Sequence, residues 1–246
     1  MSKAAQWRGA ARIGPWWAAF LGAAGDNDLH SHHAIQAFAG PHALLVDASG
    51  EHHGQGFVAP ANLAHRATGA YPSSFLYVDP DSPSGRRIAQ AIGDRISALS
   101  PIQAEELATI VETSIADEDA DPSERLAHLL GAAEIAPTRD ARIGRALAAF
   151  HESEAPLDAR AIARALNLSQ SRAAHLFRDE IGMPIRSFLL WSKLRRAMTG
   201  VAQGLSLTEA AHHGGFADSA HFSRTCVRMF GASPLTITGA IKFDEA

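Results

Sequence analysis

Short apolar runs separated by turn residues occupy the chain between residues 10 and 80. The runs are Trp16–Leu21, Ala34–Phe38, Ala43–Val46, Gly56–Ala59 and Ser74–Val78. Runs of this length, bounded by turn-forming residues, are typical of β-strands at hairpin-like spacing. The pattern therefore predicts a mostly β module at the N-terminal end.

After residue 84 the apolar positions recur with a helical period. One face holds Ile88, Ile92, Ile96 and Leu99, and a second holds Leu107, Ile110, Val111 and Ile115. A third helix is predicted over Pro122–Glu134, after an acidic break at Asp117–Asp121, and residues 136–138 (Ala-Pro-Thr) indicate a linker. These connector helices could pack on the β module or pair two subunits, and the pattern favours neither.

The segment from Leu157 to Pro184 has the spacing of a helix–turn–helix, and we call it the first unit. Asp158 can cap one helix, Asn167 can take the left-handed conformation of a tight turn, and Ser169 can cap a second helix that Gly182 ends. The small Ala163 stands where the two helices cross closely.

A second unit, from Leu205 to Pro234, repeats this design. Ser206 and Glu209 form a capping box, Ala211 is the small crossing residue, Gly215 supplies the turn and Asp218 caps the second helix. An offset of 49 residues aligns the second helices of the two units. One helix is predicted between the units, from Pro184 to Ala202, with its apolar side formed by Phe188, Leu189, Trp191, Leu194 and Met198.

The second unit resembles the AraC/XylS family of transcription regulators. The resemblance rests on Gly215-Phe216, Asp218, Phe222-Ser223-Arg224 and Gly231-x-x-Pro234, and on two correctly spaced units. It implies that the second helix of each unit enters the major groove on successive turns of one DNA face, about 34 Å apart. The implied partner is double-stranded promoter DNA, with RNA polymerase as a further partner if the protein activates transcription.

The resemblance also implies which side chains face the groove. In the first unit they are Ser171, Ala174 and His175, with Arg172 nearby as a further DNA contact, and in the second unit Ser219, Ala220, His221, Ser223 and Arg224. Of the groove-facing positions, Arg224 alone offers the bidentate fork that reads guanine, so we expect the second unit or DNA shape to carry more of the specificity. The aromatic residues and Cys226 are expected in the core.

Charge separates the two halves of the chain. Residues 1–139 contain 9 Lys+Arg and 16 Asp+Glu, whereas residues 140–246 contain 13 and 10. A basic half beside an acidic one is typical of a polyanion-binding module joined to a different module. The single cysteine excludes a disulfide framework and fits a reducing compartment, and no apolar run approaches the ~18 residues of a membrane span. We therefore predict a cytoplasmic protein with no membrane contact.

Histidines in the N-terminal half resemble the two motifs of the cupin barrel. His30 and His32 could converge with His65 of the second motif on one metal ion, with zinc, nickel, copper and iron as candidates. Gln36 replaces the usual glutamate and Asn62 replaces a glycine. The histidines serve equally well as metal ligands, as polar contacts to an organic effector together with Gln36 and Trp17, or as structural or vestigial residues.

The sequence thus predicts an α+β protein with three parts. Residues 1–84 form a cupin-like barrel that senses a ligand, residues 85–138 a helical connector that is a candidate for homodimerisation, and residues 139–240 an AraC-type double helix–turn–helix domain. Its expected function is effector-modulated regulation of transcription without enzymatic activity. Two alternatives stay open at this stage: a metal-dependent cupin enzyme fused to a DNA-binding domain, for which the motifs supply no catalytic carboxylate, and a constitutive architectural DNA binder.

Overall fold

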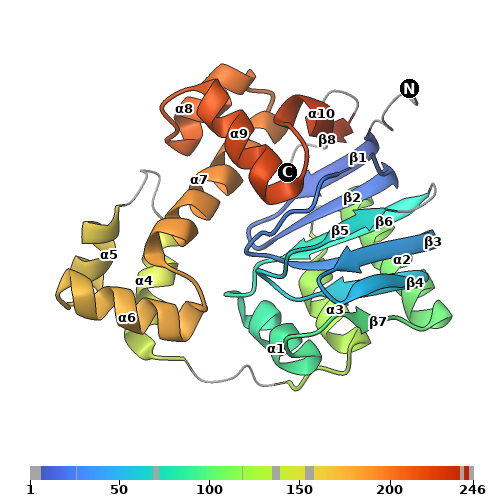
Figure 1. The fold of residues 1–246 in the computed structure, drawn as a ribbon, viewed down its shortest axis with the longest axis horizontal. Coiled ribbons are helices and arrows are strands. Elements are labelled where there is room, and N and C mark those ends of the chain that lie inside the picture. The colour runs from blue at the N-terminus through green and yellow to red at the C-terminus, as the bar shows by residue number, and fades with distance from the viewer. Residues whose placement is uncertain are drawn as a thin grey trace.

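The computed structural model describes residues 7–25, 27–68, 72–117, 119–134, 139–152, 158–238 and 241–243. Its N-terminal half is built on one sheet, and the α+β class predicted from the sequence is confirmed (Figure 1). The strands are β1 (Arg8–Ile13), β2 (Trp17–Ala23), β3 (Ile35–Asp47), β4 (Gly50–Ala59), β5 (Arg66–Thr68), β6 (Ser73–Val78), β7 (Ser97–Ala98) and β8 (Ile241–Phe243).

The strands pair in the order β7-β4-β3-β6-β2-β1-β8, with β5 on β3. Neighbours pair in antiparallel fashion except β1 and β8, which are parallel. The order is that of an open sheet with β7 and β8 at its ends, so among the described strands the expected barrel is not closed into a ring. β8, which the sequence pattern did not predict, returns the C-terminal end of the chain to the N-terminal sheet.

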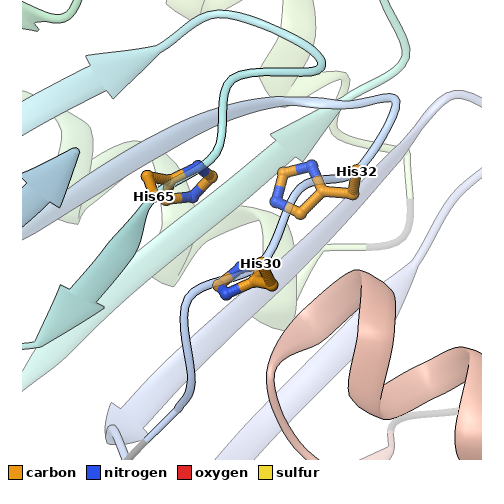
Figure 2. A group of neighbouring side chains, drawn as sticks. All are labelled: His30, His32 and His65. Atoms are coloured by element: carbon orange, nitrogen blue, oxygen red, sulfur yellow. The ribbon is translucent and has the colours of Figure 1, made fainter. Parts of the chain in front are cut away.

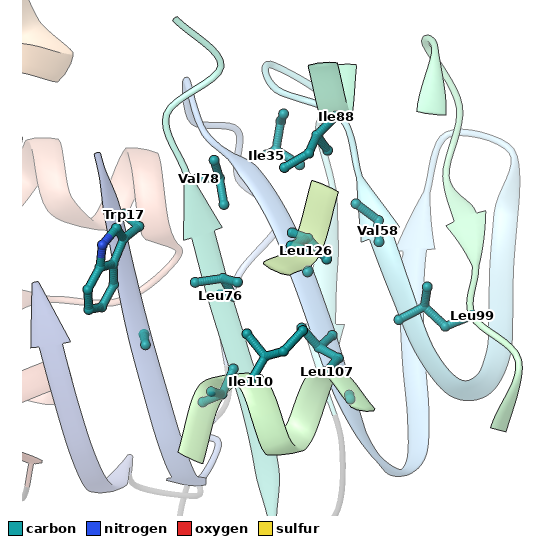
Figure 3. Close-up of a cluster of buried hydrophobic side chains, with 14 of the residues drawn as sticks. Trp17, Ile35, Val58, Leu76, Val78, Ile88, Leu99, Leu107, Ile110 and Leu126 are labelled. Carbon is teal, nitrogen blue, oxygen red and sulfur yellow. The ribbon is translucent and has the colours of Figure 1, made fainter. Parts of the chain in front are cut away.

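Three helices, α1 (Pro83–Ile92), α2 (Pro101–Ala116) and α3 (Pro122–Leu129), pack with the sheet. Figure 3 shows Leu107 and Ile110 of α2 and Leu126 of α3 against the strand residues Leu76 and Val78. The connector therefore contributes to the core of the N-terminal half.

Two of the predicted helix boundaries are wrong. Gly93, with φ 63°, ends α1, and the following residues turn into β7 on the edge of β4, so Ile96 and Leu99 are not on that helix. α3 ends at Leu129 rather than Glu134, and a left-handed Gly131 follows it. The predicted linker at residues 136–138 lies outside the described residues.

The C-terminal half is helical, as predicted. Its helices are α4 (Ala141–Glu152), α5 (Ala159–Ala165), α6 (Gln170–Ile181), α7 (Ile185–Ala202), α8 (Leu207–Gly214), α9 (Ser219–Phe230) and α10 (Pro234–Thr238). The long helix α7 runs from the first unit, α5 and α6, to the second unit, α8 and α9 (Figure 1). No helix among the described residues is long and apolar enough to cross a membrane.

Local capping explains where these helices begin and end. The side chains of Asp158, Ser169 and Asp218 accept backbone N–H bonds at the starts of α5, α6 and α9. Ser206 and Glu209 form the predicted capping box of α8. Asn167, Gly182, Gly215 and Gly231 all have positive φ at the turns, so each turn has a residue that tolerates this conformation.

Candidate DNA-binding surface and histidine centre

The second helix of the first unit, α6, presents its predicted reading residues to solvent. Ser171, Arg172, Ala174 and His175 are all exposed, while Phe177 on the opposite side is fully buried. Ser169 caps the helix and thereby fixes where this exposed face begins. The exposed face of α6 therefore carries small side chains, one imidazole and one guanidinium.

The corresponding helix of the second unit, α9, is only partly open. Ala220 and Arg224 are exposed, whereas Ser219, His221 and Ser223 are half-buried. The ring of His221 packs edge-on against Phe216, with ring centroids 5.2 Å apart. Among the predicted DNA contacts on α9, Arg224 is thus the exposed residue with a polar side chain.

Cys226 on α9 is a core residue. Its side chain is fully buried, and burial raises the pKa of the thiol above its ordinary value. Because the thiolate is the reactive form, a buried neutral thiol is inert. The aromatic residues Phe177, Phe188, Phe216, Phe222 and Trp191 are buried as well, and Phe230 is half-buried.

His30, His32 and His65 converge in the N-terminal half, and we call them the histidine centre (Figure 2). One ring nitrogen of each lies within 4.8 Å of one from each of the others. Paired backbone hydrogen bonds between His30 and His65, of 3.0 and 2.8 Å, bring the two sequence motifs together. All three side chains are buried, with exposed fractions of 4% or less.

The Nδ1 atom of each histidine is held by a backbone carbonyl. The distances are 2.8 Å from His30 to Asp28, 3.1 Å from His32 to Ala34 and 2.9 Å from His65 to Leu63. A carbonyl only accepts, so each Nδ1 carries the proton and donates it, which leaves each Nε2 with its lone pair. Metal-binding histidines are oriented by outer contacts of this kind.

Burial keeps these rings neutral. It lowers the pKa of His30 to about 4, and it lowers the pKa of His32 and of His65 below the ordinary histidine value. For His32, the neighbouring His65 and His30 lower the pKa further. Neutral imidazole is the form that coordinates a metal ion, so the centre needs no deprotonation at neutral pH.

Gln36 completes the histidine centre. Its Oε1 atom is 3.0 Å from His32 Nε2 and 3.1 Å from His65 Nε2. A half-turn of the amide would exchange Oε1 for the NH2 group, which can donate to both Nε2 lone pairs. In the orientation shown, Oε1 can instead be offered to a bound cation. The residues therefore fit a divalent metal with three imidazoles and one neutral oxygen.

The histidine centre touches the DNA-binding half. The ring of His32 is stacked on Trp191 of α7, with centroids 6.1 Å apart, and lies 5.9 Å from the ring of Phe230 at the end of α9. One residue further, the Gly231 carbonyl accepts a 3.1 Å hydrogen bond from the Asp28 amide. The histidine centre therefore contacts both α7 and the C-terminal end of α9.

A charged network that sequence reasoning missed also joins the two halves. Asp81 accepts from His33 at 2.8 Å and from Arg139 at 2.7 Å, and Asp79 accepts from Arg195 at 2.6 Å. Burial acts to raise the pKa of Asp81, but the hydrogen bonds from His33 and Arg139 hold it below its ordinary value, whereas burial raises the pKa of Asp79 despite Arg195. No local pattern indicates pairs whose members are 48, 58 and 116 residues apart.

The structure places the two predicted effector contacts in different surroundings. Gln36 belongs to the histidine centre, whereas Trp17 lines an apolar cavity between the two halves of the chain. Asn62, predicted to replace a glycine, has a φ of 64° and so takes the left-handed conformation that glycine adopts readily.

Comparison with known proteins supports the assignment of the C-terminal half. Residues 162–238 match the model of a helix-turn-helix domain family. No curated protein sequence matches the chain closely enough to count as a relative.

Solved structures of ToxT from Vibrio cholerae share the fold along most of both chains. The apo form of a ToxT variant covers 91% of this chain and 97% of its own, with 12% identity and a TM-score of 0.60. ToxT with a bound unsaturated fatty acid covers 97% and 95%, with 10% identity and a TM-score of 0.55. ToxT bound to a methylnaphthyl-butenoic acid covers 93% and 97%, with 12% identity and a TM-score of 0.55.

At such low identity the ToxT structures establish the fold alone. The assignment itself rests on the matched domain and on the two capped units that α7 joins. They show that the C-terminal half contains a helix–turn–helix domain.

Proposed function

We propose that this protein regulates transcription by binding specific promoter sequences through α6 and α9. The observation that carries this proposal is the pair of capped recognition helices joined rigidly by one 18-residue helix, α7. A fixed spacing suits two successive major grooves on one DNA face. Arg224 reads a guanine, His175 and His221 contact base edges or phosphates, and Arg172 binds a phosphate.

We further propose that a divalent metal at the histidine centre sets the affinity for DNA. The three Nε2 lone pairs supply imidazole ligands, a donor type that suits zinc, nickel, copper and iron. His32 contacts Trp191 and Phe230, so any shift of this ring on metal binding would alter the packing of the second unit. Metal and DNA then affect each other's binding by the same factor.

A small-molecule effector is a second input that this fold supports. ToxT, the structural neighbour, has been crystallised with an unsaturated fatty acid and with a methylnaphthyl-butenoic acid. We carry over from these structures only the idea of a small-molecule effector. Cytoplasmic localisation, homodimerisation and contact with RNA polymerase remain predictions that follow from the proposed role.

Catalysis at the histidine centre has less support. Gln36 replaces the cupin glutamate. Its side chain is a neutral amide that does not accept a proton near neutral pH, so it cannot serve as a general base. We therefore favour a sensor over an enzyme. An architectural DNA binder with a vestigial centre is the contrasting outcome of the experiment below.

The test uses the full-length chain without a histidine tag, mixed with fragmented DNA from its source at physiological salt. Binding is carried out once with metal removed and once with Zn²⁺, Ni²⁺, Cu²⁺ or Fe²⁺ added, and the retained fragments from each condition are sequenced. We expect a few sites with paired elements one helical turn apart, and metal-dependent occupancy. Retention without a shared sequence would support the architectural binder and contradict the proposal, because nonspecific phosphate contacts carry no sequence information.

Matched variants separate the histidine centre from histidines in general. His65→Ala should abolish the metal response, whereas His53→Ala, a change at a side chain with 71% exposure, should leave it intact. Gln36→Glu restores a carboxylate and should tighten metal binding, because an anionic ligand favours a divalent ion. A metal response that is unchanged in both His65→Ala and Gln36→Glu would rule out this centre.

A further inference from the structure

An apolar cavity of about 140 Å³ lies between the N-terminal and C-terminal halves, and we call it the junction cavity. Trp17 and Tyr77 line it from the sheet, and Trp191, Met198 and Phe230 line it from the helices. Its volume is close to that of an engineered protein cavity of about 150 Å³ that binds benzene. The junction cavity is thus large enough for one aromatic ring.

Two hydrogen-bond donors in the wall of the junction cavity have no partner among the described residues. They are the indole N–H groups of Trp7 and Trp191, whose residues are 7% and 5% exposed. A buried donor without a partner is destabilising, so native proteins rarely leave one unless water, an ion or a ligand meets it. These donors call for an acceptor atom in the cavity.

The charged lining residues are already balanced. Arg195 and Asp79 form an ion pair at 2.6 Å, so the cationic and anionic groups of the lining cancel. An anionic ligand would bring one uncompensated negative charge beside a buried carboxylate, which is unfavourable in a poorly solvated site. A neutral ligand meets no such penalty.

We infer that the junction cavity binds a small, neutral, single-ring aromatic molecule that carries a hydrogen-bond-accepting oxygen, such as an aryl ketone. The ring packs among the aromatic side chains, and the oxygen accepts from the indole N–H of Trp7 or Trp191. Because residues from both halves form the wall, this ligand stabilises their present arrangement. Tyr77, Trp191 and Phe230 also contact His32, so the ligand and the histidine centre share a wall.

The ligand class is tested by calorimetric titration of the full-length chain with three probes of similar size. Acetophenone has the ring and the acceptor oxygen, ethylbenzene has no acceptor, and benzoate is anionic. We expect acetophenone to bind at least about tenfold more tightly than either of the others, as hydrogen bonds of ordinary strength imply. Equal affinity for ethylbenzene, tightest binding of benzoate, or no binding of acetophenone would each overturn the inference.

Substitutions then locate the site. The double variant Trp7→Phe with Trp191→Phe keeps aromatic rings but removes both N–H groups, so its preference for acetophenone over ethylbenzene should disappear. Ala18→Phe adds a ring to the cavity wall and should block both probes, whereas Ala98→Phe makes the same change at an exposed strand residue and should not. A preference for acetophenone that survives the double variant would contradict the assigned donors.

The expected effect of the ligand on DNA binding rests on the proposed function, but the binding of the ligand to the junction cavity does not. In the DNA-retention assay without added probe, the Ala98→Phe variant should recover the same sites as the wild type. Acetophenone should shift wild-type retention and leave that of the double variant unchanged. Acetophenone binding without any sequence-specific retention would refute the proposed function and leave the ligand site standing, whereas specific retention without acetophenone binding would do the reverse.

Discussion

The two helix–turn–helix units share a design and differ in what covers their cores. The core of the first unit consists of residues between 143 and 189, all from α4 to α7 and the turns between them. The core of the second unit also takes in Ala34, Ile13 and Tyr77 of the N-terminal half. The second unit therefore shares a core with the N-terminal half, whereas the first has a core of its own.

The contacts to the N-terminal half differ in kind as well. The first unit and its neighbouring segment meet it through the Arg139–Asp81 ion pair and the edge contact between Phe188 and His33. The second unit is held by apolar packing, by the hydrogen bond from Asp28 to Gly231, and by β8, which follows it and pairs with β1. The histidine centre and the junction cavity therefore border the second unit, and the proposed regulation would act on this unit before the first.

The largest expected effect comes from truncating equivalent core phenylalanines. Phe177→Ala and Phe222→Ala each remove a fully buried ring, and each should lower the free energy of unfolding by about 3–5 kcal/mol. The two variants should differ in where amide hydrogen exchange becomes faster. For Phe177→Ala it should rise only within residues 143–189. For Phe222→Ala it should rise in α8 and α9 and also in β1 and β6, where Ile13 and Tyr77 pack against that core.

The matched pair makes the outcome easy to judge. Exchange in α2, which packs on the sheet through a separate apolar core, serves as the internal reference in both variants. Identical exchange patterns in the N-terminal half of the two variants would remove the distinction between a separate first unit and a shared second unit.

The difference between the units also marks what the sequence can predict. Caps and turns such as Asp158, Asn167 and Gly215 were predicted correctly because a cap and the amides it binds lie within four residues of each other. The histidine centre was predicted because its motifs have a known spacing. In contrast, the boundary at Gly93 was missed, since the apolar period continues past a residue whose backbone conformation ends the helix.

The contacts between the halves were beyond prediction. No motif around Arg195 or Asp79 indicates that they form an ion pair. The packing of α7 beside the sheet brings them together. The unpartnered indoles of Trp7 and Trp191 are likewise a property of the assembled core, because the sequence shows only that tryptophan is present. Tertiary structure, rather than any local pattern, creates the sites where regulation is proposed.

A glycine pair gives the next largest effect. Gly182 and Gly231 end α6 and α9 with φ of 78° and 68°, so alanine at either position costs about 1–2 kcal/mol of backbone strain. A Cβ at Gly182 meets nothing, but at Gly231 it would lie 2.5 Å from the Asp28 carbonyl oxygen. Gly231→Ala should therefore cost about 2–4 kcal/mol in thermal unfolding, because crowding adds to the strain.

The same variant should loosen the link between the halves. With the Asp28–Gly231 hydrogen bond displaced, metal should change DNA affinity less in Gly231→Ala than in Gly182→Ala. Titrations of DNA at fixed metal concentration measure this directly. Equal metal responses in two equally folded variants would show that the end of α9 does not transmit the signal.

A smaller effect, on DNA rather than on folding, is expected for Arg224→Ala. Loss of a bidentate contact to guanine should weaken the best site by about 1–3 kcal/mol and relax preference at one base pair. Selection of binding sites from random DNA measures the change. Unaltered sequence preference would refute the expectation that the second unit carries more of the direct readout.

The smallest effect is expected for Arg172→Ala in the first unit, where the exposed guanidinium is assigned to a phosphate. Removing one phosphate contact should weaken all sequences alike and reduce the slope of log affinity against log salt by about 1, while base preference stays the same. Arg224→Ala, measured in parallel, should change preference as well as affinity. The contrary result is that Arg172→Ala relaxes base preference as much as Arg224→Ala does. In that case the two units would share the base readout. Sequence specificity would then not be concentrated in the unit that shares its core with the N-terminal half.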